Sequence, residues 1–142
     1  MDNVNIYLYT NINTVNASDG AYGIVLEMPR EGKEAYTQTD FGLLAKCTGI
    51  HAELKTLLYA LRKLKKACDL TIYTDSSYVE GGVKWVKDWV KSDWRNSKGV
   101  EVAYKEEWQE VIELLGKHLY HFKVKEQHSY KNWLIRETKQ RR

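Results

Sequence analysis

The chain has 142 residues, of which 43% are hydrophobic and 29% are charged, and its formal net charge is +3. These values are ordinary for a globular protein with one substantial core. No apolar run reaches the roughly 18 residues of a transmembrane helix, and the first residues lack the basic and apolar regions of a signal peptide. We therefore expect a single domain over residues 1–142 that makes no membrane contact, and we assume a monomer.

The pattern of the two cysteines bears on whether the protein lies in a reducing or an oxidising compartment. Cys47 and Cys68 are isolated, with no CxxC pair and no histidine at the spacing of a zinc site. This pattern favours reduced thiols over a disulfide framework or a metal knuckle. We therefore expect a cytoplasmic protein.

The hydrophobic period changes along the chain from that of strands to that of helices. Three strand-like segments come first and are separated by turn-forming residues, which is typical of an antiparallel meander. Helix-like and strand-like segments then alternate. We expect strands at residues 4–10, 21–28, 33–41, 70–74 and 119–124, and helices at residues 50–66, 77–91, 104–115 and 132–140. The order βββαβααβα predicts an α/β fold, with a mixed sheet and helices packed on its faces.

One acidic residue stands at a junction that often carries chemistry. Asp75 follows the short apolar strand 70–74 and directly precedes a helical pattern, within the segment LTIYTDSSYVEGG. In open α/β sheets, ligands and catalytic groups gather at this carboxyl end of the strands. An aspartate is also a favoured helix cap. The local pattern alone leaves both readings open.

The element order and two motifs together resemble type 1 ribonuclease H over essentially the whole chain. The motifs are TDSSYV at the fourth strand and HAELKTLLYAL on the helix before it. Members of that family cut the RNA strand of RNA–DNA hybrids with two Mg²⁺ ions that four carboxylates hold. Such a pair of ions activates a water and stabilises the leaving oxygen. The resemblance implies a ribonuclease H-like fold with a five-stranded mixed sheet, Mg²⁺ as the cofactor and RNA–DNA hybrid as the partner.

Two of the four carboxylate positions match the family and two do not. Glu53 matches the helix glutamate and opens the core-facing stripe of its helix, although a glutamate early in a helix is also favoured by the helix dipole. Asp75 matches the aspartate of the TDS motif. Asn11 stands where the first strand of the family ends in an aspartate, and Arg136 stands where the last helix carries the fourth.

These differences predict an impaired metal site that keeps Glu53 and Asp75 as ligands. A unit charge about 4 Å from a divalent ion, at an effective dielectric of about 20, costs on the order of 8 kcal/mol gross. An arginine at position 136 therefore opposes metal binding, and Mg²⁺ binding is expected to be weak. Glu137 follows Arg136, and a shift of one residue in the register would turn its carboxylate inward.

A histidine and a basic segment complete the candidate site. His128 is the best match for the family histidine that assists proton transfer or product release, and a solvated loop histidine is the alternative. Residues 83–98 resemble the basic protrusion with which some members grip the DNA strand. For Trp85 and Trp89 we favour packing between helices over contact with nucleic acid. The expected nucleic-acid contacts are Lys84, Lys87, Lys91, Trp94, Arg95 and Lys98.

Three functions are compatible with these observations. The first is a ribonuclease H-family domain that binds RNA–DNA hybrid or related nucleic acid, with hydrolysis of the RNA strand impaired. The second is a working hybrid ribonuclease that uses Glu53, Asp75 and Glu137. The third is a former nuclease domain that now contacts proteins. The basic segment favours the first two over the third, and the two replaced carboxylates favour the first over the second.

Overall fold

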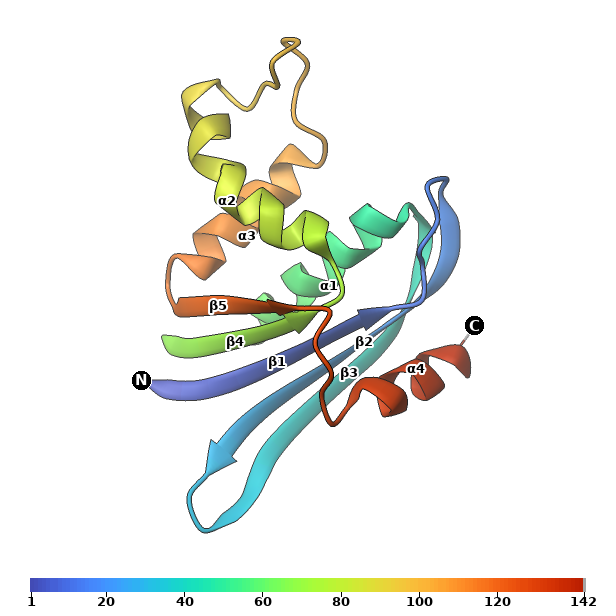
Figure 1. Ribbon diagram of the computed structural model, residues 1–142, viewed down its shortest axis with the longest axis vertical. Coiled ribbons are helices and arrows are strands. Elements are labelled where there is room, and N and C mark those ends of the chain that lie inside the picture. The colour runs from blue at the N-terminus through green and yellow to red at the C-terminus, as the bar shows by residue number, and fades with distance from the viewer. Residues whose placement is uncertain (142) are drawn as a thin grey trace.

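The computed structural model describes residues 1–141 and contains one five-stranded sheet with four helices (Figure 1). Arg142, the last residue of the expected domain, lies outside the described residues. The elements are β1 (Asp2–Thr10), β2 (Ser18–Arg30), β3 (Lys33–Cys47), α1 (Gly49–Arg62), β4 (Cys68–Thr74), α2 (Ser77–Lys91), α3 (Lys105–Leu115), β5 (Leu119–Val124) and α4 (Lys131–Lys139). None of the helices within residues 1–141 is long and apolar enough to cross a membrane.

The order and type of the elements confirm the predicted α/β fold. The sheet has the order β3-β2-β1-β4-β5 and is mixed, because β1 runs antiparallel to β2 but parallel to β4. Tyr7 of β1 lies beside Tyr73 of β4 in this register. The carboxyl ends of these two central strands therefore meet at one edge of the sheet, as the position of Asp75 required.

Element boundaries differ from the prediction where tertiary contacts decide them. β3 continues to Cys47 rather than ending near residue 41, because its second half pairs with the start of β2, with Gly20 opposite Leu44. Leu43, Ala45 and Lys46 in this added length are exposed, and Lys46 has a φ of 55°, so the alternation that marks a half-buried strand is interrupted before Cys47. α1 ends at Arg62 rather than residue 66, because the chain turns there to enter β4 at Cys68.

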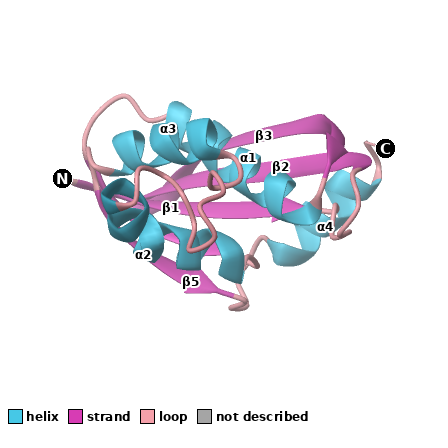
Figure 2. Cartoon of the chain, turned by 90° about the horizontal axis from the view of Figure 1, so that it is seen from above, coloured by secondary structure: helices cyan, strands magenta, loops and turns pink. Residues whose placement is uncertain are grey.

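The side chains of each strand alternate between two cores. Ile6 and Leu8 of β1 face α1 and α3 and belong to the larger core, whereas Tyr7 faces the other side of the sheet and packs with Leu134 of α4. Figure 2 shows α3 and α4 on opposite sides of the sheet. The sheet is thus covered on both faces, and the loop that leads into α4 passes the edge where β1 and β4 end.

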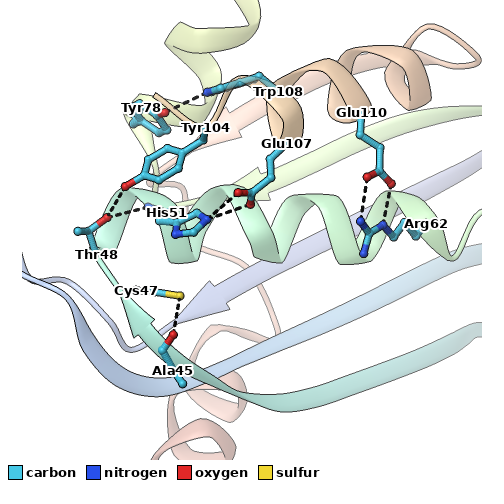
Figure 3. Close-up of polar contacts among 10 residues, drawn as sticks. All are labelled: Ala45, Cys47, Thr48, His51, Arg62, Tyr78, Tyr104, Glu107, Trp108 and Glu110. Carbon is cyan, nitrogen blue, oxygen red and sulfur yellow. Dashed lines mark hydrogen bonds and ion pairs between the residues drawn. The ribbon is translucent and has the colours of Figure 1, made fainter. Parts of the chain in front are cut away.

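Two polar contacts fasten α1 to α3 (Figure 3). His51 Nε2 lies 2.8 Å from Glu107 Oε1. About three helical turns further along α1, Arg62 donates two hydrogen bonds to Glu110, at 2.7 and 2.8 Å. A bidentate pair of this kind fixes geometry as well as adding energy. Since α1 carries Glu53, these contacts help to hold that carboxylate in position.

Candidate active site

A small cavity lies at the carboxyl ends of β1 and β4. Its walls include Thr10 and Thr74 from the two strand ends, Glu53 from α1, and Asp75 from the junction between β4 and α2. The volume is about 20 Å³, which is room for roughly one water-sized particle. The structure therefore brings together the two carboxylates whose positions match the family motifs.

Asp75 does not cap the helix that follows it. Ser76 is the cap of α2, and its hydroxyl accepts a hydrogen bond of 3.1 Å from the Val79 N–H. Asp75 instead forms an ion pair with Lys131, whose Nζ lies 2.8 Å from Asp75 Oδ1. The side chain of Asp75 is 43% exposed and that of Lys131 is 22% exposed. The capping alternative is thereby removed, and the carboxylate remains at the edge of the cavity.

Glu53 carries a proton more readily than an ordinary glutamate does. Partial burial is the largest cause and raises the pKa of its carboxyl, and the nearby negative charge of Asp75 raises it further. A hydrogen bond with Ser76 and the positive charge of Lys125 oppose these effects without cancelling them. The structure supports the placement of Glu53 at the site, on the sheet-facing side of α1.

Asn11 is adjacent to the site but is engaged elsewhere. The side-chain oxygen of Asn11 accepts a hydrogen bond of 2.9 Å from the Ala21 N–H. The backbone N–H of Asn11 donates a hydrogen bond of 3.2 Å to the Ala21 carbonyl. These bonds fasten the end of β1 to β2. Thr10, one residue earlier, lines the cavity. The amide oxygen of Asn11 is thus used within the sheet.

The last helix presents a different residue to Asp75 from the one that the motif alignment indicated. Arg136 is exposed, and it lies roughly 140° around α4 from Lys131 at 3.6 residues per turn. The carboxylate of Glu137 lies 3.6 Å from Arg141 rather than at the cavity. Lys131, which we did not single out from the sequence, is the residue of α4 that reaches the site. Its only sequence signal is that it directly precedes Asn132, where the family-like segment begins.

The sequence model of a protein family described as RNase H matches residues 3–132 of this chain. The chain belongs to the RNase H family. It is 35% identical over 104 residues to a Ribonuclease H of Rickettsia massiliae, and equally to one of Francisella tularensis subsp. novicida. Each alignment covers 72% of this chain and 65% of the relative. The alignment therefore spans less than two thirds of the length of these curated relatives.

Solved structures share the fold at lower sequence identity. LC9-RNase H1, described as a type 1 RNase H with the type 2 active-site motif, superposes with a TM-score of 0.76 at 19% identity, over all of this chain and 74% of that one. The foamy viral protease-reverse transcriptase in complex with RNA/DNA hybrid superposes with a TM-score of 0.71 at 18% identity. That match covers 98% of this chain and 19% of the viral one. Both show that the sheet and helices have the RNase H-like arrangement.

His128 of this RNase H-family chain is packed rather than solvated. Its ring lies 4.6 Å from that of Tyr7 and 5.4 Å from that of Tyr73, centroid to centroid. Its Nδ1 accepts a hydrogen bond of 3.2 Å from the Tyr130 N–H. Burial and the positive charge of Lys131 lower the pKa of the imidazole, although Asp75 opposes them. The ring is therefore neutral at pH 7, in a position close to Asp75.

A partly buried carboxylate anchors the loop that carries His128. Glu27 on β2 accepts hydrogen bonds from Asn5 Nδ2, the Tyr7 hydroxyl and the Tyr130 hydroxyl, at 2.9, 3.0 and 2.8 Å. Burial alone would raise the pKa of Glu27, but these three donors outweigh it and leave the pKa below its ordinary value. Because Tyr130 immediately precedes α4, this network fixes the position of Lys131, the first residue of that helix.

The basic segment differs from the prediction at two tryptophans. Trp94 is only 8% exposed and packs against Trp89, whereas the sequence suggested that it contacts nucleic acid. The backbone is left-handed at Trp94, with φ of 58°. Trp85 is 59% exposed on α2, contrary to the packing role that we favoured. The expected lysines and Arg95 are exposed, on α2 and on the loop that projects from the body of the fold (Figure 1).

The side chains at the cavity do not provide the ligands that a pair of divalent metal ions requires. Within residues 1–141, no group of three or more histidine, cysteine, aspartate or glutamate side chains lies close enough together to hold a metal ion. Glu53 and Asp75 are the two carboxylates at the cavity, and Asp75 is already paired with Lys131. Two Mg²⁺ ions bring four positive charges, and hard cations of this kind require several anionic oxygen ligands.

Proposed function

We propose that this chain is an RNase H-family domain that binds RNA–DNA hybrid and in which two-metal hydrolysis of the RNA strand is impaired. The observation that carries the proposal is the composition of the cavity. It has two carboxylates, Glu53 and Asp75, and one of them is paired with an ammonium group. A hydrolytic centre with two metals needs more negative charge than this pair supplies.

Hybrid binding is supported by the position of the basic residues. Five exposed cations lie along α2 and the loop after it, and the amino end of α2 adjoins Asp75. They are Lys84, Lys87, Lys91, Arg95 and Lys98. Lysine and arginine contacts with phosphates release counterions and thereby supply most of the sequence-independent affinity for a nucleic acid. Trp85, exposed among them, offers a surface for a sugar or a base.

The impairment is supported by what the other candidate ligands do. The oxygen of Asn11 is hydrogen-bonded to the β2 backbone, Arg136 is exposed, and Glu137 is paired with Arg141. None of these three supplies a negative charge at the cavity. Any Mg²⁺ that binds between Glu53 and Asp75 has to compete with Lys131, so we propose that binding is weak.

An active hybrid ribonuclease is the second candidate, and one observation favours it. His128 is neutral at pH 7 and lies near Asp75, so its imidazole is in the form that accepts a proton. This candidate also requires Glu137 to leave Arg141 and turn inward. For both candidate functions we propose a cytoplasmic location, because its reducing environment suits the two buried, unbridged cysteines Cys47 and Cys68.

The proposal is tested by the binding of a fluorescent RNA–DNA hybrid in the presence of a chelator, followed by anisotropy at several salt concentrations. We expect tight binding at low salt that weakens as salt rises. Replacing Lys84, Lys87 and Lys91 by Gln should weaken binding at low salt and reduce the salt slope by about 1 for each lost phosphate contact.

The matched control replaces Lys33, Lys65 and Lys117, which are also exposed but lie on other elements. This control removes the same net charge from the protein. A parent that does not bind hybrid at low salt contradicts the proposal. An equal loss in both triple variants would show that net charge, and not the α2 surface, determines binding.

A further inference from the structure

One carboxylate of the cavity, that of Asp75, is directly paired with a lysine, and a second lysine lies nearby. Lys131 Nζ lies 2.8 Å from Asp75 Oδ1, and Lys125 is close enough for its positive charge to act on Glu53. The backbone holds Lys125 at the end of β5, where its N–H donates to the Thr74 carbonyl at 2.9 Å. The negative charge of Asp75 is thus matched by a positive charge that belongs to the chain itself.

The ammonium of Lys131 is held in place by its helix. The side chain is 22% exposed, whereas the ion-paired lysines on the outer surface, Lys66 and Lys84, are 71% and 74% exposed. Leu134 and Thr138 of the same helix are fully buried, and the hydroxyl of Tyr130 is hydrogen-bonded to Glu27 just before the helix begins. A lysine positioned in this way loses less rotamer freedom on pairing than a surface lysine does.

We propose that the ammonium of Lys131 is the resident counter-cation of Asp75 and excludes a divalent cation from the cavity. This inference rests on the proposed function, because it concerns the same site. It implies that hybrid binding does not depend on divalent cations, since the charge of Asp75 is already balanced.

The inference is tested by titrating the free protein with MnCl₂ in a calorimeter, which reports metal binding rather than activity. We expect Lys131→Met to bind Mn²⁺ at least tenfold more tightly than the parent, because the variant leaves Asp75 free to act as a ligand beside Glu53. Lys131→Arg keeps the positive charge and should remain as weak as the parent. Lys139→Met removes an exposed lysine from the last turn of the same helix and should also match the parent.

A folded Lys131→Met variant with the affinity of the parent overturns the inference, and so does a parent that already binds as tightly as the variant. If Lys131→Met does not fold, carboxyl and lysine NMR signals of the parent decide the question during a MgCl₂ titration. We expect the Asp75 signal either to stay unmoved or to move together with that of Lys131. A shift of Asp75 while Lys131 is unmoved overturns the inference.

The two proposals fail in different measurements. Absence of hybrid binding in chelator contradicts the proposed function and leaves the metal titration unaffected. Unchanged Mn²⁺ affinity in Lys131→Met contradicts the role of Lys131 and leaves hybrid binding unaffected.

Discussion

Glu53 and Asp75 line one cavity in different electrostatic surroundings. Asp75 is partly exposed and paired with Lys131, whereas Glu53 is more buried and its carboxyl has a raised pKa, chiefly because of that burial. A carboxyl with a raised pKa in the folded state favours folding only while it is protonated. The contribution of Glu53 is therefore present below its unfolded pKa and is lost as pH rises through the folded value.

The pH dependence of this contribution gives a prediction for Glu53→Gln. The amide cannot ionise, so the variant should be more stable than the parent at pH 7, by up to about 1 kcal/mol in the free energy of unfolding. The difference should shrink towards pH 4, where the parent carboxyl is protonated. Urea unfolding at the two pH values measures it. Glu113→Gln, at an exposed position on α3, is the control and should change little. A Glu53→Gln variant that is less stable than the parent at pH 7 would contradict this account.

The packing of α2 against α3 depends on one close approach between helices. Gly82 of α2 faces the ring of Trp108 on α3, and a Cβ added at Gly82 would lie 2.2 Å from Trp108 Cη2. Trp108 is fully buried, and its indole N–H donates a hydrogen bond of 3.0 Å to the Tyr78 hydroxyl. The ring therefore has no free space into which it can move. Glycine at position 82 is required by this contact.

The neighbouring glycine supplies a matched pair of variants. Gly82→Ala should destabilise the protein by about 1–3 kcal/mol or more, because added atoms in a well-packed core force side chains and backbone to shift. Gly81→Ala meets no atom within 4 Å and should instead stabilise the helix by up to about 1 kcal/mol. Thermal unfolding of the two variants measures the difference. Equal effects at the two positions would contradict the close packing of α2 on Trp108.

At the scale of elements, hydrophobic periodicity predicted the type of each element better than it predicted the residues at which the element ends. Leucines recur at helical spacing in α1, and valines do so in α2. These patterns are properties of the local sequence, so both helices were predicted with the correct type. The residues are Leu54, Leu57, Leu61, Val79, Val83 and Val86. The extent of β3 and the burial of Trp94 were not predictable in this way. The extent of β3 depends on its pairing with β2, and the burial of Trp94 accompanies a backbone turn with φ of 58°. A hydrophobic pattern reports neither of these features.

At the scale of the whole molecule, the parallel pairing of β1 and β4 creates the site. It places the ends of two strands at one edge, where α1 and α4 also arrive, so that Glu53, Asp75 and Lys131 meet although they are far apart in sequence. The meeting of Glu53 and Asp75 was predicted from strand-end position and helical spacing. The contribution of Lys131 was not, because it depends on where α4 begins, and the Glu27 network sets that position through space.

The same geometry predicts which substitutions rebuild a hydrolytic centre. Asn11→Asp keeps an acceptor for the Ala21 N–H and adds a negative charge at the end of β1. Lys131→Asp replaces the paired cation by a carboxylate at the first residue of α4, where the helix dipole favours a negative charge. Together with Glu53 and Asp75, these changes would provide four carboxylates. Arg136→Asp, on the exposed side of α4, should not substitute for Lys131→Asp.

The most direct test of impaired hydrolysis is Mg²⁺-dependent cleavage of a labelled RNA–DNA hybrid by the parent, Asn11→Asp, Lys131→Asp and the double variant. The account predicts little cleavage by the parent and by either single variant. The double variant should cleave faster by on the order of 100-fold, because the ligands of a metal pair act as a unit. A parent that cleaves the hybrid as fast as the double variant would contradict the claim that the site is impaired.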